Sequence, residues 1–342
     1  MKNSAELKLF LIQYGILMVD LFEKLDDPKI SMEPKRILLF SDVENWAFDI
    51  DAKNIKKYAK KFVIDTCVRG DKVTKKYDLI HYMNYLDCPS DMNRHMAEIA
   101  TASVASYNFL KKLDKFKEKI TKFHKVNTIS SNLNDIVKKY RPDVLHIQKG
   151  VDLNLFTPHR KNRNTKVFTV LWVGQMPTKL SHDVKGMFRI LMPLIKSLAE
   201  YEDTIEIIIH ANTYQNALPY DRMPTIYHRA DCLIGTSECE GFQNSLLEAA
   251  ACGLPVISTN VGVAPEFITH GKNGFLVDNY YDKDEDFINE VVSKFKKYIF
   301  YLSRNRDVSE EMGKRNRDIM EKKWRWKYMA EKWENFFNRA LE

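Results

Sequence analysis

The chain has 342 residues, and 44% of them are hydrophobic, which is typical of a folded globular protein and far from disordered or collagen-like compositions. At about 100–200 residues per domain, this length indicates two domains. Five scattered cysteines without a Cys-x-x-Cys pair argue against a disulfide framework or a zinc ribbon, and favour a reducing, cytoplasmic compartment.

The formal net charge of +7 lies entirely in the first half of the chain. Residues 1–150 hold 27 Lys and Arg against 20 Asp and Glu, whereas residues 151–342 hold 26 of each. Basic runs cover 53–76 and 107–125. A basic half favours an anionic partner, either a membrane surface or a phosphorylated acceptor, and the alternative is a solvated lysine-rich face. No finger, RNP or helix-turn-helix signature accompanies the charge, so we expect no nucleic-acid partner.

The first apolar stretch, Leu7–Phe22, predicts an amphipathic helix rather than a signal peptide. Lys8, Gln13 and Asp20 interrupt it, and its cleanest run is too short for a bilayer, which needs about 20 apolar residues. We therefore expect residues 1–34 to form a helical extension.

Short apolar runs then alternate with helical patterns, which predicts βαβ units and mostly parallel sheets. The expected strands are Arg36–Ser41, Phe62–Cys67, Leu79–Met83, Val126–Ser130, Val144–Gln148, Val167–Val173, Ile205–His210, Cys232–Gly235, Pro255–Thr259 and Gly274–Val277, with Ile99–Ala105 ambiguous. The expected helices are Ile50–Lys61, Tyr107–His124, Leu133–Tyr140, Lys185–Tyr201, Asn244–Cys252, Glu285–Leu302 and Lys323–Leu341.

The helix expected at Tyr107–His124 is basic and amphipathic. Its apolar positions are Phe109 or Leu110, Leu113, Phe116, Ile120 and Phe123, and its lysine face holds Lys111, Lys112, Lys115, Lys119 and Lys122. Such a helix either packs on a sheet with a wet lysine face or lies on anionic lipid.

The segment Ala230–Asp278 carries the most specific chemistry. A buried strand ending at Gly235 leads into a polar loop, and Glu240-Gly241 opens a helix that Gly253 closes. Ligands of open α/β sheets bind outside the carboxyl ends of the strands, where a helix N-terminus favours phosphate. Gly241 allows close backbone approach.

Glu240 and Glu248 lie eight residues apart, in the loop and two turns down the helix. A carboxylate repels phosphate, so we expect both to accept hydrogen bonds from neutral sugar hydroxyls. The alternative is a solvated loop glutamate and an exposed helix glutamate.

Glu240, seven residues and Glu248, followed by Gly253-x-Pro255, resemble the E-x7-E signature of retaining glycosyltransferases of the GT-B fold, family 4 type (glycosyl transferases group 1). Further matches follow that family's order: Lys149-Gly150-Val151-Asp152, Phe156-Thr157-Pro158, Trp172-Val173-Gly174, Lys185-Gly186, Gly262–Glu266, Gly271–Val277 and the tail Lys323–Trp333. The resemblance covers residues 145–340, whereas residues 1–140 match only in their αβ pattern.

The resemblance implies an α/β GT-B protein of two Rossmann-like domains that face a cleft. We expect an acceptor-binding domain at 1–150, a nucleotide-sugar-binding domain at 151–320 and a crossover helix at 321–342 that returns to the first domain. The resemblance implies sugar transfer with retention and without a metal or permanently bound cofactor. The co-substrate is a nucleotide sugar, with UDP-sugar favoured over GDP-sugar.

The resemblance also assigns roles to residues. Glu248 holds the ribose, Glu240 contacts the transferred sugar, and Lys185 neutralises the diphosphate, so Glu240 and Lys185 are the expected catalytic residues. The expected donor site consists of Gly174, Gln175, Lys185, Glu240, Gly241, Phe242, Gln243, Asn244 and Glu248.

One departure weakens the expected diphosphate site. Gln175 stands where the family has an arginine, and Lys185 comes later than usual, after an insertion at Pro177–Asp183. Lys179 or His182 supplies a second cation, or the enzyme is weak or inactive. A GT-B pseudoenzyme acting as a partner subunit is therefore the alternative function, and an epimerase or phosphorylase follows only from fold analogy.

A second departure concerns the acceptor side. The loop after the first strand, Ser41–Trp46, lacks the family's Gly-Gly. We place the acceptor side at Asp42, Trp46 and His81, with His95 as the next candidate, and Trp46 has an alternative role in the core. The expected acceptor is a glycan or a lipid-linked sugar in cell-surface polysaccharide synthesis, at the cytoplasmic face of an anionic membrane.

Overall fold

The computed structural model describes residues 33–89, 96–158, 166–177, 183–201, 203–212 and 218–342. The chain divides into two units, Met1–Lys35 and Arg36–Glu342, and both sheets belong to the second. The helix expected at Leu7–Phe22 and the candidates Lys179, His182 and His95 lie outside the described residues.

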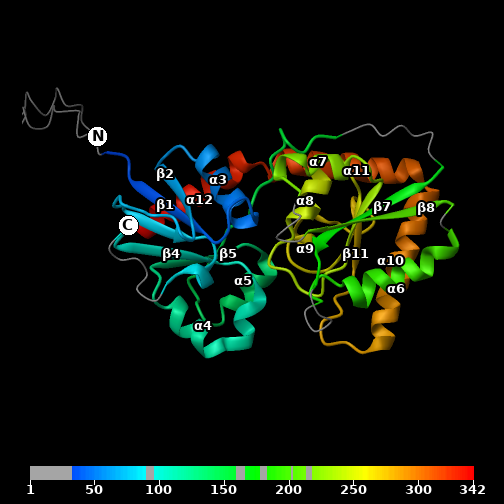
Figure 1. The fold of residues 1–342 in the computed structure, drawn as a ribbon, viewed down its shortest axis with the longest axis horizontal. Helices are drawn as coiled ribbons and strands as arrows, with labels where there is room; N and C mark the ends of the chain where they lie inside the picture. Colours follow the sequence, from blue (N-terminus) through cyan, green and yellow to red (C-terminus); the bar gives the residue numbers. More distant parts are fainter. Residues whose placement is uncertain (1–32, 90–95, 159–165, 178–182, 202, 213–217) are drawn as a thin grey trace, which may run out of the picture. The chain divides into compact units, whose positions relative to one another are not determined.

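The first sheet contains six parallel strands in the order β2-β1-β3-β4-β5-β6 (Figure 1). They are β1 (Arg36–Ser41), β2 (Val63–Val68), β3 (Leu79–Tyr82), β4 (Ile99–Val104), β5 (Lys125–Thr128) and β6 (Leu145–His146). Their connections hold α3 (Ala47–Tyr58), η1 (Tyr85–Asp87), η2 (Tyr107–Lys112), α4 (Leu113–Ile120) and α5 (Ser131–Val137). We call residues 36–148 the first lobe.

The second sheet contains five parallel strands in the order β11-β10-β9-β7-β8. They are β7 (Phe168–Gln175), β8 (Ile205–Asn212), β9 (Cys232–Gly235), β10 (Val256–Thr259) and β11 (Gly274–Val277). We call residues 166–323 the second lobe.

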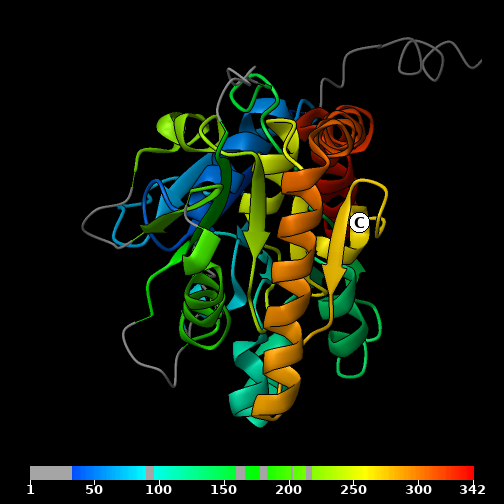
Figure 2. The same cartoon turned by 90° about the vertical axis from the view of Figure 1, so that its right-hand side faces the viewer.

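The helical elements of the second lobe are η4 (Met187–Leu191, a π-helix), α6 (Met192–Leu198), η5 (Ala199–Tyr201), η6 (Tyr220–Arg222), α7 (Pro224–Tyr227), α8 (Asn244–Ala251), α9 (Ala264–Phe267), α10 (Glu285–Arg304) and α11 (Arg306–Lys323). Figure 2 shows α10 running along one face of the second sheet, where Val291, Phe295 and Ile299 are buried. On another side, α8 packs against α11.

The last helix, α12 (Trp326–Leu341), returns to the first lobe and packs against α3. Val151 bridges Arg325, and the Glu334 carboxylate accepts the backbone N–H groups of Lys60 and Lys61. Because Glu334 is buried, these hydrogen bonds offset the cost of removing its charge from water. The expected crossover helix is confirmed.

Each sheet has a topological switch point, where the connections from two neighbouring strands run to opposite sides of the sheet. In the first sheet this point lies between β1 and β3, and in the second it lies between β7 and β9. The loops that follow those strands diverge there and leave a crevice at the carboxyl edge of the sheet, where open α/β sheets bind ligands.

Most expected strands are confirmed within one or two residues, and the ambiguous Ile99–Ala105 contains β4. The helix expected at Tyr107–His124 is divided, because Lys112 has φ −146° and ψ 57° and separates η2 from α4. Its apolar stripe is nevertheless core, with Phe109, Phe116 and Ile120 buried.

The helix expected at Lys185–Tyr201 begins as a π-helix. Both Ile190 and Leu191 donate to the Gly186 carbonyl, and Pro193 follows in the next turn. Proline has no N–H and cannot continue the regular ladder, which accounts for a wider turn here.

Within the described part of the chain, no helix is long and apolar enough to cross a membrane.

Candidate functional site

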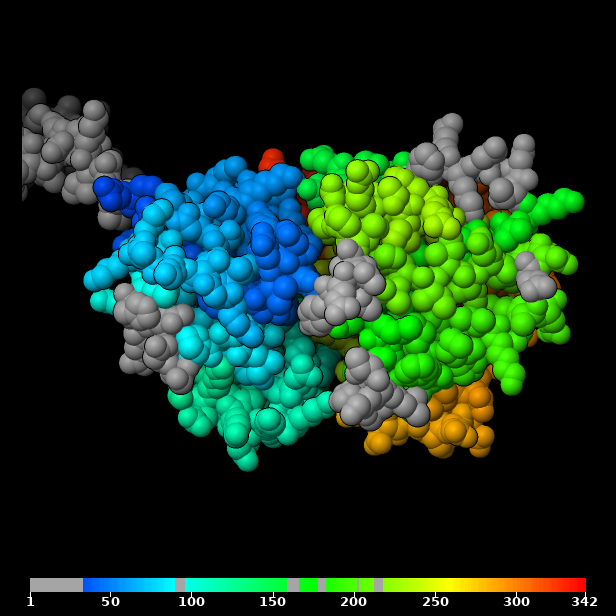
Figure 3. All heavy atoms as spheres, in the orientation of Figure 1, coloured from blue at the N-terminus to red at the C-terminus, as the bar shows by residue number. Residues whose placement is uncertain are grey.

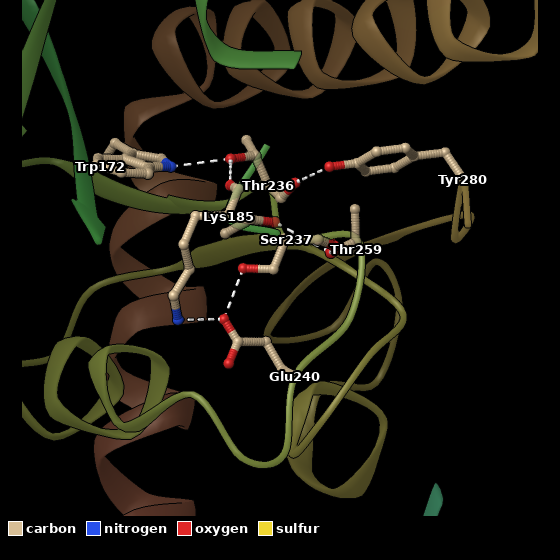
Figure 4. A network of polar contacts seen from close by, with 8 residues as sticks. Trp172, Lys185, Thr236, Ser237, Glu240, Thr259 and Tyr280 are labelled. Atoms are coloured by element: carbon tan, nitrogen blue, oxygen red, sulfur yellow. Dashed lines mark hydrogen bonds and ion pairs between the residues drawn. The ribbon is translucent and has the colours of Figure 1, made fainter. Parts of the chain in front are cut away.

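The crevice of the second sheet lies between the loops that follow β7 and β9. The first loop brings in Lys185, and the second brings in Thr236, Ser237 and Glu240 (Figure 4). Residues that the sequence separates by more than fifty positions therefore meet at one sheet edge.

A hydrogen-bond network fixes the backbone of these two loops. The Trp172 indole N–H donates to the Thr236 hydroxyl over 2.8 Å, and that hydroxyl donates to the Lys185 carbonyl over 2.7 Å. The Tyr280 hydroxyl donates to the Thr236 carbonyl, also over 2.7 Å. Trp172 and Thr236 are buried, so the loops are held in place by groups that water does not reach (Figure 4).

Gly186 is required by this packing. It has φ +70°, and a Cβ added there would lie 2.1 Å from the Thr236 carbonyl oxygen. Only glycine combines that conformation with such close approach. Asp183 stabilises the turn that follows, because its carboxylate accepts the N–H groups of Met187, Phe188 and Arg189 over 2.7–2.9 Å.

Lys185 and Glu240 form an ion pair, with 2.5 Å between Lys185 Nζ and Glu240 Oε1. Ser237 Oγ donates to the same oxygen over 2.7 Å. The side chains of Lys185 and Glu240 are 31% and 10% exposed, so the pair is accessible from the crevice. The structure thus brings together the two residues that the sequence predicts as catalytic.

The helix after this loop begins at Asn244, as the expected helix Asn244–Cys252 predicts, and not directly at Glu240-Gly241. Gln243 has φ +75°, a left-handed conformation that an α-helix excludes. Phe242 is buried and packs near Trp324 and Lys149, so it contributes backbone rather than side chain to the crevice.

Gly241 is needed where the two lobes meet. A Cβ at Gly241 would lie 1.9 Å from the Ala105 carbonyl oxygen, in the segment that follows β4. The sequence predicts that the backbone at Gly241 is closely approached, and in the structure the approaching group is the Ala105 carbonyl of the first lobe.

Tyr107 and Lys111 from η2 lie within electrostatic reach of this loop. Burial raises the pKa of Tyr107 to about 12, and Cys239 and Glu240 add to that rise. Burial with Glu240 raises the pKa of the Cys239 thiol to about 11, while Lys185 and Lys111 oppose it. The segment after β4 thus lies beside the loop that contains Glu240, a neighbour that the sequence did not predict.

Glu248 lies on α8 and is 8% exposed. Its Oε2 accepts a hydrogen bond of 2.5 Å from the hydroxyl of Tyr227, which is fully buried in α7. Burial, with the nearby Asp51 carboxylate, raises the pKa of Glu248 to about 7, whereas Tyr227 and Lys149 act to lower it.

Glu248 also borders a small pocket. The pocket is lined by Ile50, Asp51, Gly150, Val151, Tyr220, Asn244, Leu247, Glu248 and Trp326. Beside it, Lys149 pairs with Asp51 over 2.6 Å, and both side chains are almost fully buried. Two of the expected donor residues, Asn244 and Glu248, therefore share one pocket with residues of α3 and α12.

Gly174 and Gln175 end β7, two residues beyond the expected strand Val167–Val173. Gly174 is buried, and a Cβ there would lie 2.5 Å from the Trp172 ring. Gln175 is exposed.

The acceptor-side expectation for His81 disagrees with the structure. His81 is fully buried in β3, its ring nitrogens contact the hydroxyls of Thr101 and Ser103, and α12 packs against it through Trp333 and Phe336. Burial lowers the pKa of His81 to about 3. This histidine is a neutral core residue that no acceptor reaches.

Asp42 and Trp46 lie in the loop after β1 and are partly exposed. Asp42 accepts the Val43 N–H over 2.8 Å, and Trp46 immediately precedes α3.

Glu266, at the family's G-x-x-E position, contacts the first lobe. Burial alone would raise its pKa, but hydrogen bonds from His146, Gln148 and the Ser131 N–H lower it below its usual value. A charged Glu266 therefore ties α9 to the first lobe. The motif gave the position of this residue, but not its partners.

Comparisons with known proteins agree with this geometry. Residues 205–316 match the family model "Glycosyl transferases group 1". The D-inositol 3-phosphate glycosyltransferase of Paenarthrobacter aurescens is 27% identical over 194 residues, which cover 47% of this chain and 48% of that protein. The GDP-mannose-dependent alpha-(1-6)-phosphatidylinositol monomannoside mannosyltransferase of Mycobacterium tuberculosis is 28% identical over 42% of this chain, and the match spans 36% of that protein. These matches thus span half or less of either relative.

Among solved structures, sucrose-phosphate synthase of Thermosynechococcus elongatus has a TM-score of 0.67 at 13% identity, covering 90% of this chain and 99% of that one. HepE of Anabaena in complex with UDP-glucose has a TM-score of 0.64 at 13% identity, covering 89% and 99%. At this identity the likeness concerns the fold, and it confirms the expected GT-B architecture. Residues 205–316 are thus similar to the glycosyl transferases of group 1, and the described chain has the fold of the GT-B glycosyltransferases.

Proposed function

We propose that this protein transfers a sugar from a nucleotide-diphosphate sugar to a glycan or lipid-linked acceptor, with retention at the anomeric carbon and without a metal ion. The observation that carries the proposal is the meeting of Lys185 and Glu240 at the topological switch point of the second sheet. A cation and a carboxylate side by side suit a ligand with a diphosphate at one end and hydroxyls at the other.

Each side chain has a distinct role. Lys185 binds the diphosphate and stabilises the charge that develops on it as the glycosidic bond breaks. Glu240 accepts hydroxyls of the transferred sugar, and Glu248 accepts those of the ribose. The backbone of Phe242–Asn244 lines the sugar and phosphates.

The donor base is uracil or guanine, with uracil favoured. The structural neighbour HepE is in complex with UDP-glucose, and one relative is named as GDP-mannose-dependent. A thermal-shift panel of UDP, GDP and ADP with their sugar derivatives identifies the base. A protein that none of them stabilises would contradict the proposal.

The acceptor side lies on the first lobe, where Tyr107 is within electrostatic reach of Glu240 and Lys111 is within reach of Cys239. Asp42 and Trp46, in the loop after β1, belong to the same side. A hydroxyl and an ammonium group suit an acceptor that carries hydroxyls and a phosphate. The segment that contains α4 forms part of the surface in Figure 3 (teal), and Lys115 and Lys117 of this helix are exposed, in keeping with work at the cytoplasmic surface of an anionic membrane during polysaccharide synthesis.

Two glutamate variants test the donor roles. Glu248→Ala weakens nucleotide binding, because the ribose loses its acceptor, whereas Glu240→Ala lowers turnover more than nucleotide affinity. Glu311→Ala, an exposed residue of α11 that pairs with Arg315, is the matched control. Unchanged affinity and turnover in both site variants would remove the basis of the assignment.

The second candidate function is a partner subunit without catalysis, and exposed Gln175 in place of a cation favours it. Donor hydrolysis in the absence of acceptor distinguishes the two. With acceptor present, NMR of the product gives the anomeric configuration, and activity that survives a chelator supports metal independence.

A further inference from the structure

Glu248 is a buried carboxylate with an unusual set of neighbours. Its helix α8 packs against α7, whose last residue, Tyr227, donates to Oε2 over 2.5 Å. Within the part of the chain that the structure describes, the Glu248 side chain accepts this one hydrogen bond. A carboxylate can accept several hydrogen bonds, so Glu248 keeps acceptor capacity beyond the bond from Tyr227. Because Glu248 also lines the pocket, a ligand bound there can use that capacity.

The nearest cation is engaged elsewhere. Lys149 lies 2.6 Å from Asp51, and their side chains are 6% and 4% exposed. Glu248 therefore shares the field of one lysine with a second buried carboxylate. A buried charge without a dedicated cation depends on its hydrogen bonds, and a short bond from a hydroxyl to a carboxylate is among the stronger ones.

We propose that Tyr227 is a positioning residue, whose hydroxyl holds one oxygen of Glu248 so that the remaining acceptor capacity of the carboxylate faces the ribose hydroxyls of the donor. The proposal rests on the proposed function, because it assumes that Glu248 binds the ribose. Tyr227 itself is fully buried and reaches the nucleotide only through Glu248.

The arrangement predicts a pH dependence of nucleoside binding. The titratable groups that face Glu248 are Tyr227 of α7, Tyr220 of η6, Asp51 of α3, Lys149 and Cys252. Burial holds the pKa of Glu248 at about 7, and the Tyr227 hydrogen bond acts to lower it. Since the ionised carboxylate is the better acceptor, affinity rises as pH increases through 7. Removal of the Tyr227 hydroxyl moves that rise to higher pH.

The test compares Tyr227→Phe with the wild type by calorimetry from pH 6 to 9, with UDP, GDP, uridine and guanosine as probes. We expect the variant to bind the preferred nucleotide about tenfold more weakly at pH 7. The same factor applies to its nucleoside, because both contain the ribose. At pH 9 the difference in affinity between Tyr227→Phe and the wild type narrows to a few-fold. A purely structural defect would not give this rescue.

Tyr82→Phe is the matched control, since it removes another fully buried tyrosine hydroxyl, in β3. It leaves the affinity and its pH profile unchanged. Thermal unfolding of each variant reports on folding separately.

The outcomes distinguish the positioning role of Tyr227 from the ribose-binding role of Glu248. If Glu248→Gln weakens nucleoside binding and Tyr227→Phe does not, the positioning role is wrong and the proposed function stands. Weakening by Tyr227→Phe with an unshifted pH profile also overturns the positioning role. If no probe binds the wild type, or if Glu248→Gln binds as the wild type does, the ribose role of Glu248 fails, and the inference fails with it.

Discussion

The two sheets differ in whether their expected site residues come together at the carboxyl edge. In the second lobe, Lys185 and Glu240 arrive from the loops after β7 and β9 and meet within 2.5 Å. In the first lobe, His81 lies in the core, and Asp42 and Trp46 occupy the loop after β1. The part of the first lobe that lies beside the Glu240 loop is instead the segment after β4.

The difference shows which kind of site a sequence reveals. The proposed donor residues lie at the end of β7, in the loops after β7 and β9 and on α8, so motifs of fixed spacing contain most of them. The proposed acceptor side is formed by the segment of the first lobe that lies beside the second lobe. Tertiary contacts such as Gly241 against Ala105 decide which segment this is, and no local sequence pattern encodes them.

The largest effect is expected where the lobes touch. Gly241→Ala places a methyl group within 1.9 Å of the Ala105 carbonyl oxygen, which forces the backbone of one lobe to move. Displacement of about 1 Å at a reacting centre costs roughly 100-fold in rate, so we expect turnover to fall by at least about that factor. Turnover and thermal unfolding measure it.

Gly271→Ala is the control, because that glycine has φ +76° and open space around it. It costs only the backbone strain, about 1 kcal/mol of stability, and leaves turnover unchanged. Equal turnover in Gly241→Ala and the wild type would show that the contact between the lobes does not matter for the reaction.

A smaller effect is expected at the diphosphate. Lys185→Ala removes a charge-assisted contact of about 1.5–3 kcal/mol, which corresponds to roughly 10–100-fold in affinity. The loss applies to the nucleoside diphosphate and not to the nucleoside, as calorimetry with both would show. Lys294→Ala, which removes an equally short ion pair with Asp278, is the control.

Equal weakening of diphosphate and nucleoside would mean that Lys185 only shapes its loop. Gln175→Arg sharpens the test, since improved diphosphate affinity would show that the position still accommodates a second cation.

A still smaller effect separates the acceptor from the donor side. Lys111→Gln raises the KM for the acceptor about fivefold and leaves nucleotide affinity unchanged, because this exposed lysine of the first lobe lies within electrostatic reach of Cys239 in the Glu240 loop. The neighbouring exposed residue, Lys112→Gln, serves as the control in the same kinetic assay. A change in nucleotide affinity alone would place Lys111 on the donor side.

The smallest effect for a single residue concerns the membrane. Lys112, Lys115 and Lys122 are exposed, whereas Lys119 donates to the carbonyls of Leu86 and Cys88 and is left intact. Each change of the first three to Gln weakens co-sedimentation with anionic vesicles by up to about 1 kcal/mol, less as salt screens the charges. Wild-type protein that stays in the supernatant at low salt contradicts a membrane role.

The sequence predicted both parallel sheets, because apolar strands are local signals. A contiguous motif supplied the candidate donor residues, and their roles stay a prediction. It missed α11, whose buried positions include Gly313 and Asn316, residues that apolar periodicity does not register. It missed Tyr227 as well, because only the packing of α7 on α8 brings that hydroxyl to Glu248. The role expected for His81 was wrong, because the sequence predicts that the last helix returns to the first domain but not that it covers β3.

The central claim is that the loops after β7 and β9 hold the donor, and amide hydrogen exchange with and without nucleotide tests it most directly. UDP or GDP, whichever binds, should slow exchange in residues 183–190 and 236–252 and leave α4 unchanged. Slowed exchange confined to the first lobe, with calorimetry showing that the nucleotide is bound, would contradict the account.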